Sequence, residues 1–166
     1  MSQILILLRH AKAVPWQSGI DDFARDLAGK GEAHMDQLSR WVNEHLEVPE
    51  RVLCSTAART VQTLAPFLSA WGESAPAVSY LDSMYHASTG SLHHLAVEAL
   101  NSADSVLMVG HNPGFENLAL GLMPDADRAK HQRMATGTLG VFEFENGFDG
   151  GEHDGRLLHW VTRKDF

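Results

Sequence analysis

Two short apolar runs, each followed by a histidine, constrain the fold of this chain more than any other feature. Ile4–Leu8 leads into Arg9-His10-Ala11-Lys12-Ala13, and Val106–Val109 leads into Gly110-His111-Asn112-Pro113-Gly114. Each run has the length and composition of a buried β-strand. Ligands of α/β proteins bind in the crevice at the carboxyl ends of the strands, so both histidines and Arg9 are expected there. The pattern predicts chemistry on an anion.

Strand and helix patterns alternate through residue 122, which indicates βαβ crossovers and a mainly parallel sheet. We therefore predict an α/β fold, a three-layer α/β/α sandwich, in one domain over residues 1–166. Residues 14–28 and 124–135 are expected to be loops. The remaining strands are expected at 51–54, 78–81, 105–109, 139–145 and 157–162, and the helices at 30–46, 57–71, 88–100 and 113–122.

Helix capping patterns give finer expectations. Ser55 or Thr56 can cap the helix that follows, and Asn112 can cap the next one along the crevice, with Pro113 as its first residue. Apolar periodicity places His34 on the outer face of the helix at 30–46. The helix after Asn112 then directs its positive end at the crevice.

Charge and composition exclude several classes of partner. The 166-residue chain carries a formal net charge of -8, which argues against nucleic acid and anionic membranes as general partners. No apolar run approaches the roughly 20 residues of a membrane span, and no signal-peptide pattern is present. We expect a cytoplasmic protein whose anion site is local.

Cysteine and histidine usage indicates neither a disulfide nor a metal site. Cys54 is the single cysteine. Four residues separate it from Arg59 without the glycines of a phosphate-encircling loop, so a cysteine-dependent phosphatase is disfavoured. Seven other histidines lack ligand-like spacing with a carboxylate and are interpreted as surface or packing residues: His34, His45, His93, His94, His131, His153 and His159.

Four basic residues suit phosphoryl transfer. Arg9 and His10 follow the first strand, Arg59 lies on the first turn of a helix, and His111 follows a later strand. Two guanidinium groups and a donor histidine can bind three phosphoryl oxygens, which leaves His10 free to attack. Nearby Arg9, Arg59 and a charged His111, together with burial, are expected to lower the pKa of His10.

Five motifs in order resemble the histidine phosphatase superfamily, and within it the SixA-type phosphohistidine phosphatases. The resemblance implies a phosphoglycerate mutase-like fold, a phosphorylated His10 during turnover, phosphoryl binding by Arg9, Arg59 and His111, and no metal or organic cofactor. Asp26 and Ala135 depart from the pattern, where proline is expected. The matching segments are 8–13, 25–31, 54–63, 84–88 and 109–114, with Thr136-Gly137 as a further likeness.

Three further residues are candidates for substrate contact. Arg25 lies in the second matching segment, Ser55 is first a cap and second a phosphate ligand, and Asn112 is first a cap. Many relatives that cleave sugar or glycerate phosphates carry a glutamate acid after the third strand, whereas this chain offers only Asp82 nearby. An imidazole leaving group needs less help from a general acid than an alkoxide does. The lack of a strong, well-placed acid therefore favours a phosphohistidine substrate.

The predicted function is hydrolysis of phosphohistidine on a signalling or phosphotransfer protein. The short spacing between Arg59 and His111 leaves no room for a long lid, so the site can admit a folded partner. Two alternatives stay open: a broad small-molecule phosphomonoesterase that uses Asp82 or another acid, and a catalytically weak phosphate-binding module.

Overall fold

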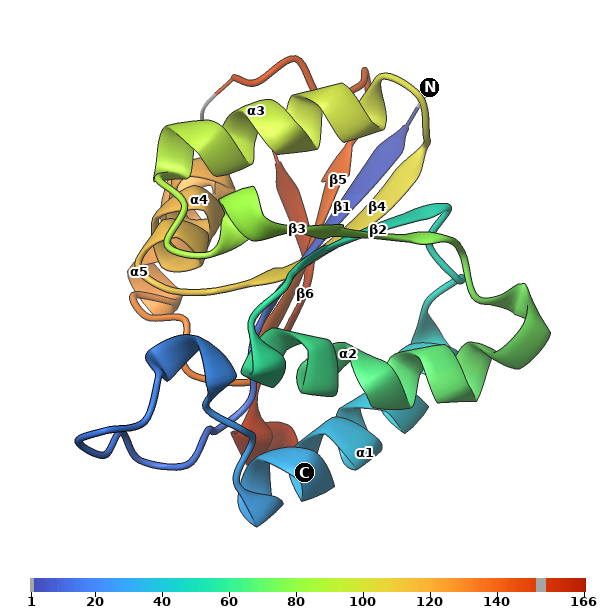
Figure 1. Cartoon of the computed structure of the whole chain (residues 1–166). Helices are drawn as coiled ribbons and strands as arrows, with labels where there is room; N and C mark the ends of the chain where they lie inside the picture. The colour runs from blue at the N-terminus through green and yellow to red at the C-terminus, as the bar shows by residue number, and fades with distance from the viewer. Residues whose placement is uncertain (1, 152–154) are drawn as a thin grey trace.

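The computed structural model describes residues 2–151 and 155–166; His153 lies outside the described residues. A six-stranded sheet runs through the middle of the molecule in the order β3-β2-β4-β1-β5-β6 (Figure 1). The strands are β1 Gln3–Arg9, β2 Arg51–Ser55, β3 Val78–Leu81, β4 Ser105–Gly110, β5 Leu139–Phe144 and β6 Arg156–Val161.

Strand register decides where the two histidines meet. The first four strands of that order, β3 to β1, are parallel, whereas β5 and β6 are antiparallel to their neighbours. Arg9 pairs with Gly110 at the ends of β1 and β4, and the His10 amide donates a 3.0 Å hydrogen bond to the Gly110 carbonyl. His10 and His111 therefore leave neighbouring strands at the same edge of the sheet.

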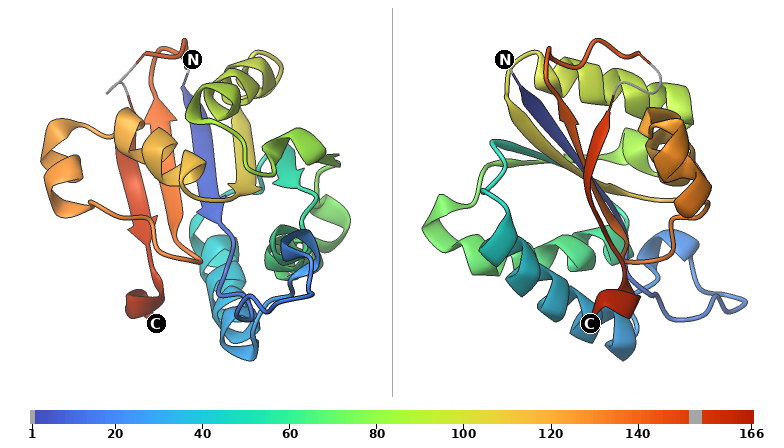
Figure 2. Two further views of the ribbon diagram at one scale, coloured as in Figure 1. Left: turned by 60° about the vertical axis from the view of Figure 1, so that its left-hand side comes forward. Right: turned by 180° about the vertical axis from the view of Figure 1, so that it is seen from behind.

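Helices cover both faces of the sheet, which confirms the predicted three-layer sandwich with a mainly parallel sheet. Figures 1 and 2 show α1 and α2 on one face and α3 and α4 on the other. Two apolar clusters, one on each side of the sheet, form the core. The helices are α1 Gly29–His45, α2 Ala58–Trp71, α3 Thr89–Leu100, α4 Gly114–Leu122 and α5 Asp125–Lys130, with short 3-10 turns η1 Asp22–Ala24, η2 Gly72–Ser74, η3 Asp82–Met84 and η4 Arg163–Asp165.

Several local expectations are wrong. The 124–135 segment contains α5 rather than only loop. Neither Ser55 nor Thr56 is the cap of α2; Ala57 occupies that position without a side-chain hydrogen bond, although its amide donates a 3.4 Å hydrogen bond to the Ser55 hydroxyl. Within the described part of the chain, no helix combines the length and hydropathy needed to cross a membrane.

Two more expectations are corrected in detail. The α4 helix begins one residue later than predicted, with Pro113 at the cap position, although the Asn112 side chain still accepts a hydrogen bond from the Glu116 amide. His34 is only 4% exposed instead of lying on the outer face of α1. The C-terminal residues cover that face, and the Phe166 ring lies 5.9 Å from the imidazole of His34.

Candidate active site

His10 and His111 face each other at the carboxyl ends of β1 and β4. Their ring centroids lie 5.3 Å apart, and the two side chains are only 7% and 6% exposed. The parallel register of the two strands places them there, since each histidine is the first residue after its strand. The predicted crevice therefore contains both imidazoles.

His10 is neutral with one nitrogen free. Its Nδ1 lies 2.7 Å from the carbonyl oxygen of Ala11, so Nδ1–H donates and Nε2 carries the lone pair. Burial lowers the pKa of His10 to about 4, more than the partly opposing hydrogen bond to Ala11 raises it, and the guanidinium groups of Arg9, Arg59 and Arg25 lower it further. The expected direction of the shift is found, but burial outweighs the arginines.

His111 is also neutral, contrary to the expected charged form. Burial is the main cause that lowers its pKa to about 3, and His10, Arg59 and His86 add to the effect. Its Nε2 lies 2.8 Å from the Ser55 hydroxyl, while its buried Nδ1 has no hydrogen-bond partner among the described residues. The second imidazole thus presents an unused polar atom in the crevice.

The arginines Arg9 and Arg59 are held by backbone carbonyls. Arg9 Nη1 donates to the Met134 carbonyl at 3.0 Å, and Arg59 Nη1 donates to the Asp22 carbonyl at 2.8 Å. The buried Nε atoms of both side chains lack hydrogen-bond partners within residues 2–151 and 155–166. Each guanidinium is therefore fixed in place and retains an N–H group that can bind an anion.

Asp22, which the sequence analysis did not single out, connects the cations. Its carboxylate lies 3.1 Å from Arg59 Nη2 and 3.1 Å from Arg25 Nη2, and it accepts a 2.5 Å hydrogen bond from the Tyr85 hydroxyl. That hydrogen bond is the main cause that lowers the pKa of Asp22 to about 2; burial opposes the shift, and the two arginines lower the pKa further. Asp22 is the anion that stabilises a cation on the first turn of α2.

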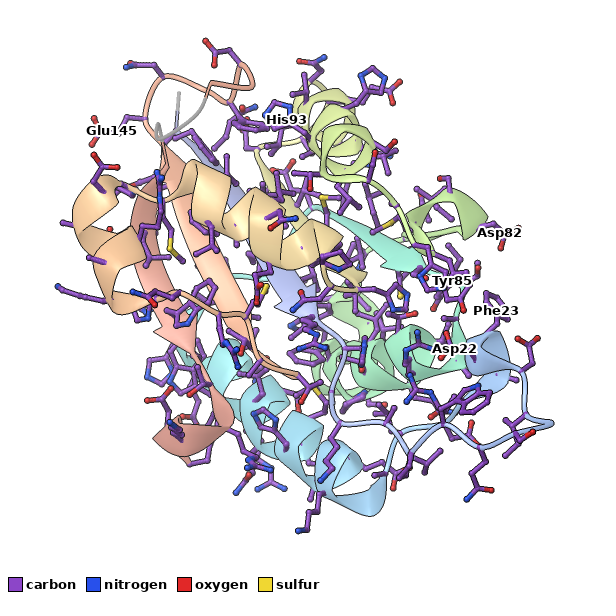
Figure 3. All side chains as sticks on the ribbon, turned by 90° about the vertical axis from the view of Figure 1, so that its left-hand side faces the viewer. Asp22, Phe23, Asp82, Tyr85, His93 and Glu145 are labelled. Atoms are coloured by element: carbon purple, nitrogen blue, oxygen red, sulfur yellow. The ribbon has the colours of Figure 1, made fainter. Side chains whose placement is uncertain are left out.

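Tyr85 closes this side of the crevice. Its ring lies 5.4 Å from that of His111, and the Arg59 guanidinium carbon lies 5.8 Å from the Tyr85 ring centroid. Figure 3 shows Asp22, Phe23 and Tyr85 together, with Asp82 farther out along the same edge. Burial and the Asp22 carboxylate raise the pKa of Tyr85, so its hydroxyl stays a donor. The matching segment 84–88 contained this signal, but its tyrosine was assigned no role.

The three predicted substrate contacts occupy different places. Ser55 bonds to His111, and Arg25 reaches the crevice through Asp22 while it also donates to the Val14 carbonyl at 3.1 Å. Asn112 Nδ2 donates to the Met134 carbonyl at 2.9 Å, the same oxygen that holds Arg9. Ser55 therefore supports His111, whereas Arg25 and Asn112 share hydrogen-bonding partners with Arg59 and Arg9.

Asp82 and Cys54, the two other residues considered for catalysis, lie outside this network of contacts. Asp82 is exposed, and its carboxylate accepts a hydrogen bond from the Thr56 hydroxyl. Cys54 is fully buried, and burial raises the pKa of its thiol to about 12. A thiolate nucleophile at neutral pH is therefore excluded. Over the described ranges, no group of three or more histidine, cysteine or acidic side chains is arranged to hold a metal ion.

Comparisons with known proteins agree with this fold. No family model matches the chain. An uncharacterized protein of Mycobacterium tuberculosis is 35% identical over 130 residues, which span 77% of this chain and 78% of that protein. A candidate phosphohistidine phosphatase SixA from Agrobacterium tumefaciens has a TM-score of 0.82 and 29% identity, with 96% of this chain and 97% of that chain covered.

The chain belongs to the histidine phosphatase superfamily, in its SixA type. A second candidate SixA structure, from Nakamurella multipartitia, has a TM-score of 0.80 and 28% identity over 98% of this chain and 96% of that one. The fold is accordingly phosphoglycerate mutase-like, as the sequence motifs implied. Superfamily membership indicates a phosphatase.

Proposed function

We propose that this chain is a phosphohistidine phosphatase that acts on a signalling or phosphotransfer protein through a phosphorylated His10. The neutral imidazole of His10 carries the proposal, because its Nδ1 is tied to the Ala11 carbonyl and its Nε2 lone pair is free at neutral pH. Arg9, Arg59 and His111 surround it as ligands for the phosphoryl oxygens. This arrangement combines a nucleophile with fixed positive charge, as phosphoryl transfer requires.

In the first step, His10 Nε2 attacks phosphorus as the bond from phosphorus to the substrate imidazole breaks. The bonding pair returns to that nitrogen, and the imidazole leaves neutral because its other nitrogen carries a proton. The unused N–H groups of Arg9 and Arg59 bind two of the phosphoryl oxygens. His111 donates to the third oxygen from Nδ1, which requires the Ser55 hydroxyl to donate to Nε2 and so fix the tautomer. Ser55 is therefore a positioning residue.

In the second step, water attacks phosphorus, the bond to His10 breaks, and Nε2 recovers its lone pair as phosphate leaves. Asp22 cannot protonate a leaving group near neutral pH, because its pKa of about 2 keeps it ionised. Asp82 is exposed and bound to Thr56. An imidazole leaves with less help from an acid than an alkoxide does, so a site with no acid in place among the described residues supports phosphohistidine over a phosphate ester as the substrate.

A two-substrate assay tests the proposal. Release of phosphate from a histidine-phosphorylated phosphotransfer protein and from p-nitrophenyl phosphate is measured for the wild type, His10→Ala and His94→Ala. We expect a higher kcat/KM on the phosphoprotein, background activity in His10→Ala, and unchanged activity in His94→Ala, because His94 is an exposed residue of α3 whose ion-pair partner is Glu98.

The alternatives give different results. Hydrolysis of the ester at equal or higher kcat/KM, with loss of that activity in Asp82→Asn, would indicate a small-molecule phosphomonoesterase. Tight phosphate binding without turnover of either substrate would indicate a binding module. Activity retained in His10→Ala would refute the covalent mechanism.

A further inference from the structure

A strongly basic hollow lies beside the candidate active site. It has a volume of about 640 Å³, and we call it the basic pocket, defined by Lys12, Lys30, His34, Arg133, Arg163 and Lys164. Lys12 follows β1, Lys30 and His34 belong to α1, Arg133 precedes β5, and the last two belong to η4. Figure 2 shows the C-terminal turn near α1, and both elements contribute lining residues. Four separate segments thus bring five cations together.

The basic pocket has far more positive than negative charge. Five of the 13 lysines and arginines line it, with no acidic side chain in its lining, although the chain has a net charge of -8. Within the described ranges, none of the five forms an ion pair. The nearby Asp165 carboxylate accepts a 2.7 Å hydrogen bond from the amide of Thr162, a lining residue. Five cations with one carboxylate nearby favour an anionic ligand.

Two buried polar groups in the lining give an independent indication. His34 is 4% exposed and Thr138 is fully buried, and both residues belong to the lining of the basic pocket. His34 Nε2 and Thr138 Oγ1 have no hydrogen-bond partner in the described part of the chain. Buried polar atoms are usually paired, so unpaired ones at the wall of a hollow indicate contacts that a ligand completes.

The basic pocket is distinct from the crevice but joined to it by the backbone. Of the four candidate active-site residues, none lines it. The Gly137 amide donates to the carbonyls of Arg9 and His10 at 3.2 and 2.9 Å, and the Thr138 carbonyl accepts from the Arg9 amide at 3.1 Å. The wall of the pocket is therefore hydrogen-bonded directly to the segment that carries the nucleophile.

We propose that the basic pocket is a second anion-binding site, for a small polyanion that carries two or more phosphate or carboxylate groups. Its volume lies in the range of small-molecule sites, and cations on several walls suit several charged groups better than one. A small molecule that enters the hollow can contact cations on several of its walls at once. The proposal goes beyond the phosphatase function and does not rest on it.

Calorimetric titration with tripolyphosphate and with orthophosphate tests the proposal on the full chain. Arg163→Gln/Lys164→Gln removes two charges from the basic pocket, and Arg40→Gln/Lys130→Gln removes two exposed charges elsewhere as the matched control. We expect tripolyphosphate to bind the wild type more tightly than orthophosphate does. The pocket variant should bind it at least ~10-fold more weakly, because two charge-assisted contacts are lost, whereas the control variant should differ little.

Two further variants separate the possible sites. Lys30→Gln/Arg133→Gln, on other walls, should weaken binding as Arg163→Gln/Lys164→Gln does. Arg59→Gln, in the crevice, should leave a tripolyphosphate site intact. Equal weakening by the pocket and control variants, loss of all binding in Arg59→Gln, or no measurable binding would overturn the proposal. Tighter binding of a glutamate-rich peptide than of tripolyphosphate would also overturn it, by assigning the basic pocket to a protein partner.

Discussion

Acidification should destabilise this protein through its two crevice histidines before any other part of the site titrates. The pKa values of His10 and His111 are about 4 and about 3 in the folded state, mainly because both imidazoles are buried. In the unfolded chain both pKa values return to about 6.5. Between these limits the unfolded state binds more protons than the native state, so the free energy of unfolding falls as the pH falls.

The size of this effect follows from the shifts. Above pH 7 both states are neutral at these positions and the contribution vanishes. From pH 7.5 to 5.5, each histidine lowers the free energy of unfolding by about 1.3 kcal/mol, so the pair lowers it by roughly 3 kcal/mol. With an m-value of about 2 kcal/mol/M, the midpoint of urea unfolding should move by roughly 1.5 M. Asp22, whose pKa is about 2, keeps its charge throughout this range.

Urea unfolding at half-unit pH steps, followed by circular dichroism, measures the effect in the wild type and in His10→Gln/His111→Gln. Other histidines titrate in both proteins, so the difference between the two curves isolates the pair. The double variant should lose most of the dependence between pH 7.5 and 5.5. Parallel curves would refute the conclusion that burial keeps both imidazoles neutral, and with it the basis for His10 as a nucleophile at neutral pH.

Three further changes test the supporting contacts. Tyr85→Phe should raise the pKa of Asp22 above about 2, because the hydrogen bond from the tyrosine is the main cause of the shift. The pKa can be followed by NMR of the Asp22 carboxyl carbon, and an unchanged titration curve would contradict the prediction. Ser55→Ala should lower the free energy of unfolding by ~1–3 kcal/mol, since His111 Nε2 is left buried without its partner, and a loss below ~0.5 kcal/mol would contradict this. Gly137→Ala should destabilise by at least ~1–3 kcal/mol, because its φ is +72° and the added Cβ would lie 2.5 Å from His34. Gly121→Ala, in α4 with nothing within 4 Å of the added Cβ, should be neutral or gain up to ~1 kcal/mol, and equal losses at the two glycines would disprove the steric explanation.

Local patterns were sufficient for the six strands, for α1 to α4 and for the meeting of the two histidines, but they missed α5. The apolar runs before Arg9 and His111 predicted β1 and β4, and parallel strands end at one edge of a sheet whatever the rest of the chain does. The helical periodicity of α1 to α4 likewise predicted the layers. It failed at His34, where the exposed face of an amphipathic helix is covered by the distant C-terminal turn.

The rest of the site depends on contacts between segments that no local pattern relates. Asp22 lies in a loop without periodicity, 37 residues from Arg59 and 63 from Tyr85, yet it joins both. The neutral state of His111 depends on its desolvation, which only the complete packing of the crevice sets.

The sequence by itself determined the α/β order, the sheet edge that carries His10 and His111, and the family motifs, because strand and helix formation follow from neighbouring residues. The tertiary structure decided which carboxylate balances the arginines, that both crevice imidazoles are neutral, and where the five cations of the basic pocket gather. Burial and charge pairing depend on distances in space, and these exist only once the chain has folded.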